Sequence, residues 1–303
     1  MKFERLLVLI DAERKDQPAL QRAAWLAERT GAELHLLLCA FSSSLDHNLF
    51  LEGPRLEQAR DAFLEERRNW LDTLAAPLRS NGGKVHTRVI WSKQRQRASL
   101  DAISALQPDL VFKSAHHHGL LKRLLLSNSD WELLRHCPAP LWLVHHGEWQ
   151  ARKLCAALDP LHSADKPAAL DHRLIDIAGE LATQLGLEPH YLHSFAPLPR
   201  SLVFDLEMVM SYEQYSSKCA SQHREAFEQL LAQHTIPPTS SHLLEGYAEQ
   251  RIPAFVREQG IDLLLMGAIS RGQLDAAIIG NTAERVLDEV ECDLLVVKPA
   301  TTP

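Results

Sequence analysis

Residues 109–144, DLVFKSAHHHGLLKRLLLSNSDWELLRHCPAPLWLV, can be laid over residues 262–297, DLLLMGAISRGQLDAAIIGNTAERVLDEVECDLLVV, without a gap and at a constant offset of 153 residues. The alignment pairs identical residues along its length: Asp109 with Asp262, Gly119 with Gly272, Asn128 with Asn281 and Val144 with Val297. Solenoid units repeat at roughly 20 to 50 residues, so a period near 150 residues indicates a duplicated domain. We therefore expect two domains, residues 1–148 and 149–303.

Each copy alternates short apolar segments with longer segments of helical periodicity. Strands are expected at Leu6–Ile10, Glu33–Ala40, Val85–Trp91, Asp109–Lys113 and Leu141–His145, and again at Leu154–Leu158, Pro189–Ser194, His242–Glu245, Asp262–Met266 and Asp293–Val297. Pro18 and Pro167 are typical of helix starts, and Gly31 and Gly186 of helix ends. Strands that are apolar throughout are typical of a parallel sheet covered on both faces. The predicted fold class is α/β, with two tandem Rossmann-like domains, each an open, five-stranded parallel sheet flanked by helices.

The composition is that of an ordinary globular protein. Hydrophobic residues make up 46% of the 303 residues and charged residues 23%, and the formal net charge is −7. This balance does not favour nucleic acid as a partner, because phosphate binding draws on a basic surface. The basic cluster Lys93, Arg95 and Arg97 is more typical of a solvated loop than of an anion site. No apolar run approaches the ~18 residues of a membrane span, so membrane insertion is not expected.

The cysteines and the N-terminus bear on the compartment. Five cysteines, an odd number without a CxxC pair, favour reduced thiols over a disulfide framework. The charged residues Lys2, Glu4 and Arg5 lead directly into a short apolar run, which is not the pattern of a secretory signal. We therefore expect a cytoplasmic protein.

The candidate ligand site lies in the second copy. Met266 and Gly267 close an apolar strand, and Gly280, Asn281 and Thr282 open a helix thirteen residues later. Glycine permits close approach of the backbone, and the first turn of a helix presents free N–H groups and a positive dipole end to an anion. Asp159, at the tip of the first strand of this copy, is expected to face the same crevice. A glycine turn followed by a capped helix explains the pattern equally well.

These residues resemble the universal stress protein family, and the resemblance covers both copies. Its nucleotide-binding branch carries Gly-x2-Gly-x9-Gly followed by Ser or Thr. In DLLLMGAISRGQLDAAIIGNT, Gly267 and Gly280 occupy the first and third glycine positions, Ser270 occupies the middle position with Gly272 two residues later, and Asn281 replaces the Ser or Thr. Gly246 fits a further glycine of the family. The motifs GNTAE (280–284) and DW.LLR.CP.P.W.V (130–144) are similar to those of the E-type tandem members.

The resemblance implies several further properties. It implies a strand order of 3-2-1-4-5 in the adenine nucleotide alpha hydrolase-like manner, ATP as a ligand with Mg²⁺ accompanying it, and a role in stress tolerance. It also implies an intramolecular pseudo-dimer of the two domains through their fifth strands, with a homodimer as a further assembly. The residues alone fix no cofactor and no catalytic group.

The first copy departs from the glycine pattern. Lys113-Ser114 replaces Met266-Gly267, and Ser127-Asn128-Ser129 replaces Gly280-Asn281-Thr282. Side chains at these positions are expected to prevent this half from cradling a triphosphate.

Two weaker signals remain. His116 and His118 follow the fourth strand of the first copy and His145 follows the fifth, so imidazoles from neighbouring strand ends are candidate Zn²⁺ ligands, although solvated loop histidines explain them better. The segment 195–215, rich in Met and aromatic residues, is a candidate lining for a lipid-like ligand, although core packing is the preferred explanation.

The function predicted from the sequence is that of a ligand-binding, regulatory protein for stress tolerance, with a crevice for an adenine nucleotide or other small molecule in the second domain. A slow ATPase that uses the same crevice is one alternative. A scaffold with vestigial sites is the other.

Overall fold

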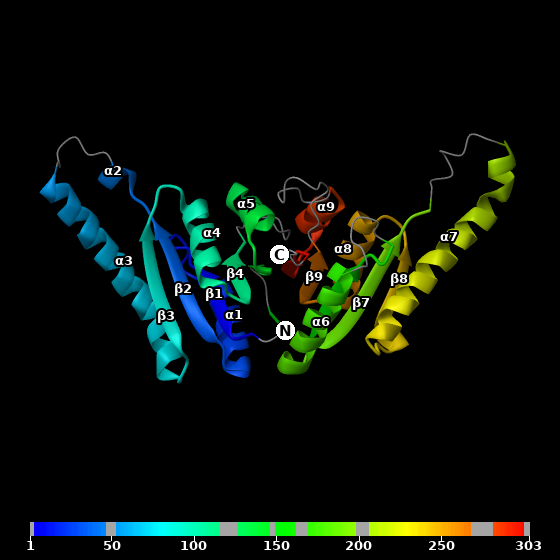
Figure 1. Ribbon diagram of the computed structural model, residues 1–303, viewed down its shortest axis with the longest axis horizontal. Helices are drawn as coiled ribbons and strands as arrows, with labels where there is room; N and C mark the ends of the chain where they lie inside the picture. The colour runs from blue at the N-terminus through cyan, green and yellow to red at the C-terminus, as the bar shows by residue number, and fades with distance from the viewer. Residues whose placement is uncertain are drawn as a thin grey trace. The chain divides into compact units, whose positions relative to one another are not determined.

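A computed structural model describes residues 3–46, 53–115, 126–145, 149–161, 169–197, 206–267 and 281–299 (Figure 1). The chain divides into two compact units, one built on strands β1 to β5 and the other on strands β6 to β10. They are described one after the other.

The first unit alternates strands with helices. Its elements are β1 (Arg5–Leu9), α1 (Pro18–Thr30), β2 (Glu33–Ala40), α2 (Ser43–Asp46), α3 (Pro54–Ser80), β3 (Val85–Trp91), α4 (Arg95–Leu106), β4 (Leu110–Ser114), α5 (Asn128–His136) and β5 (Leu141–Val144). The strands lie in the order β3-β2-β1-β4-β5, and all four neighbouring pairs are parallel.

The second unit repeats this plan. Its elements are β6 (Lys153–Leu158), α6 (Ala169–Leu185), β7 (Glu188–Phe195), α7 (Leu206–Gln233), the 3-10 turn η2 (Pro238–Ser240), β8 (Ser241–Glu245), α8 (Ala248–Gln259), β9 (Leu263–Gly267), α9 (Asn281–Glu289) and β10 (Asp293–Val297). The order is β8-β7-β6-β9-β10, again parallel throughout. Both units therefore have the predicted 3-2-1-4-5 sheet.

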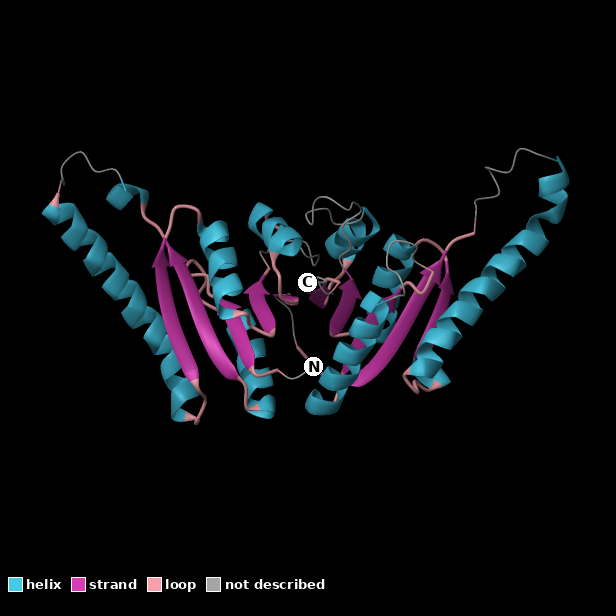
Figure 2. Cartoon of the chain, viewed as in Figure 1, coloured by secondary structure: helices cyan, strands magenta, loops and turns pink. Residues whose placement is uncertain are grey.

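The core of each unit is the central strands and the helices that flank them (Figure 2). Strands β5 and β10 are buried at every position. Trp142 and Phe112 are completely buried in the first unit, and their rings stack with centroids 5.1 Å apart. Burial of this kind on both faces explains why the strand segments are apolar without alternation.

An aspartate ties the central strands together in each unit. Asp109, before β4, accepts hydrogen bonds of 2.8 Å from the N–H groups of Glu4 and Arg5 at the start of β1. Asp262, before β9, accepts bonds of 2.8 and 3.0 Å from the N–H groups of Arg152 and Lys153 at the start of β6. The repeated Asp-Leu dipeptide thus fixes the entry of two neighbouring parallel strands.

Helix ends follow the expected local chemistry. Pro18 begins α1, and Gly31 ends it with a φ of 73°, which is the left-handed conformation that glycine favours. Gly186 follows α6 with a φ of 68°. Pro167 lies outside the described residues. The short α2 and η2 were not predicted, because single turns carry no periodic apolar pattern.

Within the part of the chain that the structure describes, no helix combines the length and the apolar character that crossing a membrane requires.

Candidate functional site

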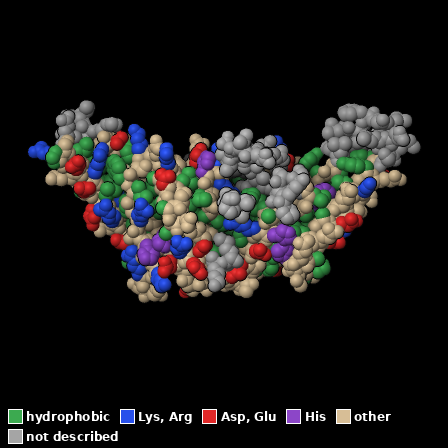
Figure 3. Space-filling model, viewed as in Figure 1, with side chains coloured by type: hydrophobic (Ala, Val, Ile, Leu, Met, Phe, Trp, Pro, Cys, Tyr) green, Lys and Arg blue, Asp and Glu red, His purple; other side chains and the backbone are tan. Residues whose placement is uncertain are grey.

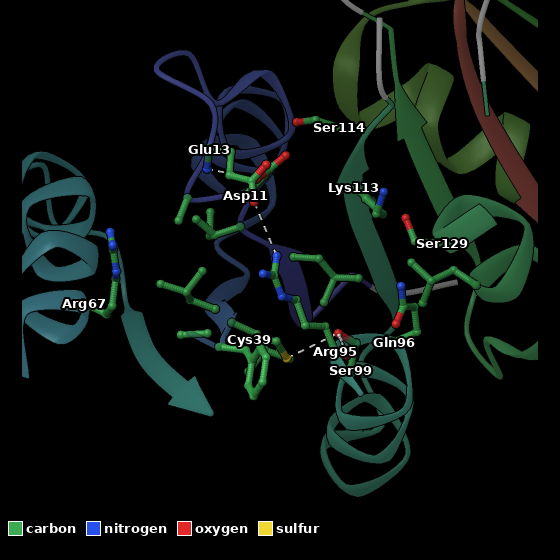
Figure 4. A pocket seen from close by; sticks show the side chains of 18 of the residues that line it. Asp11, Glu13, Cys39, Arg67, Arg95, Gln96, Ser99, Lys113, Ser114 and Ser129 are labelled. Carbon is green, nitrogen blue, oxygen red and sulfur yellow. Dashed lines mark hydrogen bonds and ion pairs between the residues drawn. The ribbon is translucent and has the colours of Figure 1, made fainter. Parts of the chain in front are cut away.

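A cavity of about 310 Å³ opens at the carboxyl ends of β1, β2 and β4 in the first unit (Figure 4). Asp11 and Glu13 border it from the turn after β1, Arg67 from α3, and Arg95 from the first residue of α4. Ligands of open parallel sheets bind at this edge. The cavity therefore lies where the fold places ligands, and it presents charges of both signs.

The polar groups of this cavity partly pair with one another. Arg95 Nη1 lies 3.6 Å from Glu13 Oε1. Cys39 Sγ lies 3.4 Å from Ser99 Oγ, and burial raises the pKa of the Cys39 thiol above its ordinary value, with Ser99 opposing the shift. Cys39 is therefore a protonated, weakly reactive thiol at neutral pH.

The start of α5, at the edge of the cavity, is occupied by side chains of the protein itself. Ser127 Oγ accepts a bond of 3.3 Å from the N–H of Asp130, and Asp130 Oδ2 accepts one of 2.7 Å from the N–H of Ser127, which makes a complete capping box. Lys113, at the end of β4, forms an ion pair with Asp130. The Asp130 side chain is 0% exposed and that of Lys113 is 13% exposed. A carboxylate and its counter-ion thus fill the position where a helix N-terminus receives an anion.

The second unit has neither partner of this ion pair. At the offset of 153 residues, Met266 replaces Lys113 and Ala283 replaces Asp130. Met266 is buried in β9, and Ala283 is half-buried in the first turn of α9. The start of α9 therefore has no carboxylate at the position of Asp130, and the acid of its first turn is Glu284, one residue later.

Gly246 and Gly267 have separate structural reasons to be glycine. Gly246 has a φ of 133°, which other residues rarely adopt, and its carbonyl accepts a bond of 2.8 Å from Ser194 Oγ. A Cβ at Gly267 would lie 2.5 Å from Cδ2 of Leu170 in α6. Close packing of α6 on β9 thus accounts for Gly267 without a ligand.

Two histidines that the sequence did not single out lie near Asp159. His193 is 1% exposed, with Nδ1 2.9 Å from the carbonyl oxygen of Leu158 and Nε2 2.8 Å from Nδ1 of His223. Burial lowers the pKa of both rings, whereas the charge of Asp159 raises them. Since a carbonyl only accepts, Nδ1 of His193 carries the proton, and His223 donates to its Nε2. The two rings therefore form a fixed chain of hydrogen bonds beside the end of β6.

The remaining predicted site residues fall in three groups. Ser270, Gly272 and Gly280, as well as His116 and His118, lie outside the described residues. Asn281 and Thr282 begin α9, as expected, but their side chains are not described. His145 is buried directly after β5.

The sequence held a signal for some of the site residues that its analysis did not predict. Arg95 belongs to the basic cluster that the sequence favoured as a solvated loop, yet it starts α4 and borders the cavity. His193 and His223 stand 30 residues apart, and only the packing of α7 on β7 brings them together.

The comparisons agree with this architecture. The model of the universal stress protein family matches residues 2–145 and again residues 151–298, so the chain belongs to this family as a tandem member. The universal stress protein E of Escherichia coli K12 is 29% identical over 98% of this chain and 94% of its own length, and that of Salmonella typhi is equally similar. A protein of unknown function from Pseudomonas aeruginosa PAO1 has a solved structure that is 27% identical, with a TM-score of 0.76 over 98% of this chain and 93% of that one.

Proposed function

We propose that this protein is a ligand-binding, regulatory member of its family, and that its second unit binds a small anionic ligand of the adenine nucleotide type between the ends of β6 and β9 and the start of α9. The observation that carries the proposal is the difference between the two helix starts. Asp130 and Lys113 occupy the first, and Ala283 and Met266 stand at the second.

The physical argument concerns the first turn of each helix. The N–H groups there and the positive end of the helix dipole attract one negative group. In the first unit Asp130 is that group, and Ser127 and Lys113 hold it in place. In the second unit the equivalent position is Ala283, which offers no charge to compete with a ligand phosphate, and the acid of that turn is Glu284, one residue later. The first unit is therefore proposed to hold no triphosphate at α5.

The proposal is tested by transferring the carboxylate. Ala283→Asp places an acid where the first unit has one, and Asp is well tolerated in the first turn of a helix. Isothermal titration of the full chain with MgATP should show saturable binding that this variant weakens at least about tenfold, or about 1.4 kcal/mol.

The matched control is Ala283→Asn, which has almost the same size but no charge. It should retain most of the affinity, since the argument depends on the negative charge. Equal loss in both variants would assign the effect to bulk, and an unchanged affinity in Ala283→Asp would remove α9 from the site. Release of inorganic phosphate from bound ATP would instead favour the slow ATPase.

A cytoplasmic location belongs to the same proposal. All five cysteines lie among the described residues and none of them forms a disulfide, which suits a reducing compartment.

A further inference from the structure

A second cluster of polar side chains lies away from the carboxyl edge, near the start of β2. Among the residues that the structure describes, Glu33, His35 and His86 are the one group whose ligand atoms, one from each residue, all lie within 4.8 Å of one another. His35 and His86 face each other across β2 and β3, and their rings stack with centroids 4.7 Å apart. Glu33 Oε2 lies 3.9 Å from Nε2 of His86. On the visible face, histidines lie beside acidic and basic side chains over these strands (Figure 3).

The half-buried ring of His35 has an unused nitrogen. Nε2 of His35 is inaccessible to solvent and has no hydrogen-bond partner. A buried polar atom without a partner costs free energy, and such an atom in a folded protein calls for an explanation. A neutral imidazole nitrogen of this kind has a lone pair that a metal ion can accept.

A cavity of about 290 Å³ adjoins the two rings. We call it the histidine pocket, and it is lined by Leu7, His35, His86, Arg88, Ala102 and Leu106. It leaves room beside the imidazoles for an ion and for a water or ligand in a further coordination position.

The second unit provides a natural contrast. Glu188 and His190 occupy the places of Glu33 and His35, but His242 lies two residues further along its strand than His86, opposite Leu192 and not opposite His190. His190 Nδ1 lies 3.0 Å from Nε2 of His242, and Glu188 Oε1 lies 3.4 Å from Nε2 of His190. Nε2 of His190 is also buried without a hydrogen-bond partner, but among the described residues these three offer no set of ligand atoms that all lie within 4.8 Å of one another.

The helix above the rings differs as well. Phe255 of α8 packs on His242 at 4.7 Å and on His190 at 6.3 Å between centroids. At the offset of 153 residues, α4 has Ala102 in place of Phe255. The aromatic ring thus fills in the second unit the space that is the histidine pocket in the first.

We propose that Glu33, His35 and His86 of the first unit bind a divalent transition-metal cation such as Zn²⁺, and that the second unit has lost this capacity. Two imidazoles and one carboxylate form a usual ligand set for Zn²⁺, with the fourth position open to water or a ligand. Bond lengths of ~2.0 to 2.1 Å in a tetrahedral site require ligand atoms about 3.3 Å apart, so the exposed His86 must turn slightly toward Glu33 and His35.

Positively charged side chains also lie near the cluster. Lys84 Nζ lies 3.3 Å from Glu33 Oε1, and Arg5 and Arg88 are close to the rings. The Lys84 side chain is 71% exposed, so its pair with Glu33 is a weak surface interaction that a metal can displace. The other oxygen of Glu33 is the one nearest to His86.

The test counts bound metal ions on the full chain. Equilibrium dialysis with ZnCl₂ at pH 7.5 should show that His86→Ala loses one bound Zn²⁺ per chain relative to the unchanged protein. Glu33→Gln should weaken the same site at least about tenfold, since ligand substitutions cost at least as much as the ~10- to 100-fold of second-shell changes.

The matched control is His242→Ala, which removes the imidazole that contacts His190 in the second unit and should leave the number of bound ions unchanged. His86 and His242 both sit on edge strands, so the two variants perturb folding to a similar degree. An equal number of bound ions in His86→Ala and the unchanged protein would overturn the proposal, as would an equal loss in both variants or an absence of saturable binding. Loss of the ion in His145→Ala alone would place the metal at the carboxyl edge and would overturn it too.

Discussion

The starts of α5 and α9 occupy the same place in their respective units and have opposite chemistry. In the first unit a buried carboxylate, Asp130, is held by Lys113 and Ser127, and in the second unit Ala283 and Met266 take the places of the ion pair. Both members of the pair differ together, because a single buried charge without its partner is strongly destabilising. The difference teaches that coordinated substitutions separate the two copies and turn a charged, self-capped helix start into one that is uncharged at these two positions, or the reverse.

The largest effect is expected from breaking the pair in the first unit. Asp130→Ala leaves Lys113 almost buried without its counter-ion and removes the acceptor for the N–H of Ser127. The unfolding free energy should fall by about 3 to 5 kcal/mol, which is typical when one member of a buried ion pair is removed. Urea denaturation followed by circular dichroism measures it.

The double variant Lys113→Met with Asp130→Ala is its control, because it gives the first unit the residues of the second. It should recover much of the lost stability, since replacing both charges by apolar groups is often nearly neutral. If the double variant is as unstable as the single one, the pair is not the source of the effect.

A smaller effect is expected where the two units differ next to this pair. Gly267→Ser copies Ser114 of the first unit, whose Oγ accepts a bond of 3.2 Å from the N–H of Ala19. In the second unit Leu170 lies there, 2.5 Å from the position of a Cβ. Overpacking should cost about 1 to 2 kcal/mol, because the end of Leu170 can turn only partly away.

Thermal unfolding of Gly267→Ser and of Gly267→Ser with Leu170→Ala distinguishes overpacking from other causes. If overpacking is the cause, the Ser substitution should cost less in the Leu170→Ala background than in the unchanged protein. An equal cost in both backgrounds would place the strain elsewhere.

The fold follows from the sequence because its determinants are local or repeated. Apolar strands, the proline at the start of α1 and the glycine at its end each act within a few residues, and their repetition in both copies doubled the signal. The Asp-Leu dipeptides were visible in the alignment as well. Their task, which is to join the first strand to the fourth across 104 to 110 residues, emerged only from the structure.

The candidate site was predictable only where the ligand-binding pattern lies within one connection of the chain. Met266, Gly267 and the helix start at Asn281 belong to one β9-to-α9 connection, so the spacing of glycines exposed them. The pair Lys113–Asp130 spans 17 residues, and His193–His223 spans 30. Their significance depends on burial and on side-chain direction, which the spacing of residue types does not encode.

Histidines with lowered pKa values make the stability of the two units depend differently on pH. Burial is the main reason that the pKa is lowered for His190, His193, His223 and His242 in the second unit and for His35 in the first. A histidine with a lowered folded-state pKa is protonated first in the unfolded chain, so its contribution is complete above about pH 6.5 and is lost as the pH falls below that value.

For a fully buried ring such as His193, this loss amounts to at most about 0.7 kcal/mol between pH 7 and pH 6. Hydrogen exchange at the two pH values, corrected for intrinsic rates, should show a larger decrease in protection for β7 and β8 than for β2 and β3. A decrease of equal size in both units would contradict the assignment of acid sensitivity to these rings.

The smallest effect concerns an ion pair on the surface of the second unit, between Arg285 of α9 and Glu249 of α8. Its atoms lie 3.2 Å apart, but the Arg285 side chain is 69% exposed. Water and salt screen such a pair, so a double-mutant cycle of Arg285→Ala and Glu249→Ala should give a coupling of about 0.2 to 1 kcal/mol that declines further at high salt. A coupling well above 1 kcal/mol that is insensitive to salt would mean that distance governs these pairs. A small coupling would mean that burial governs the strength of these pairs. The exclusion of water around Asp130 would then be the reason that removing one member of its ion pair lowers the unfolding free energy so much.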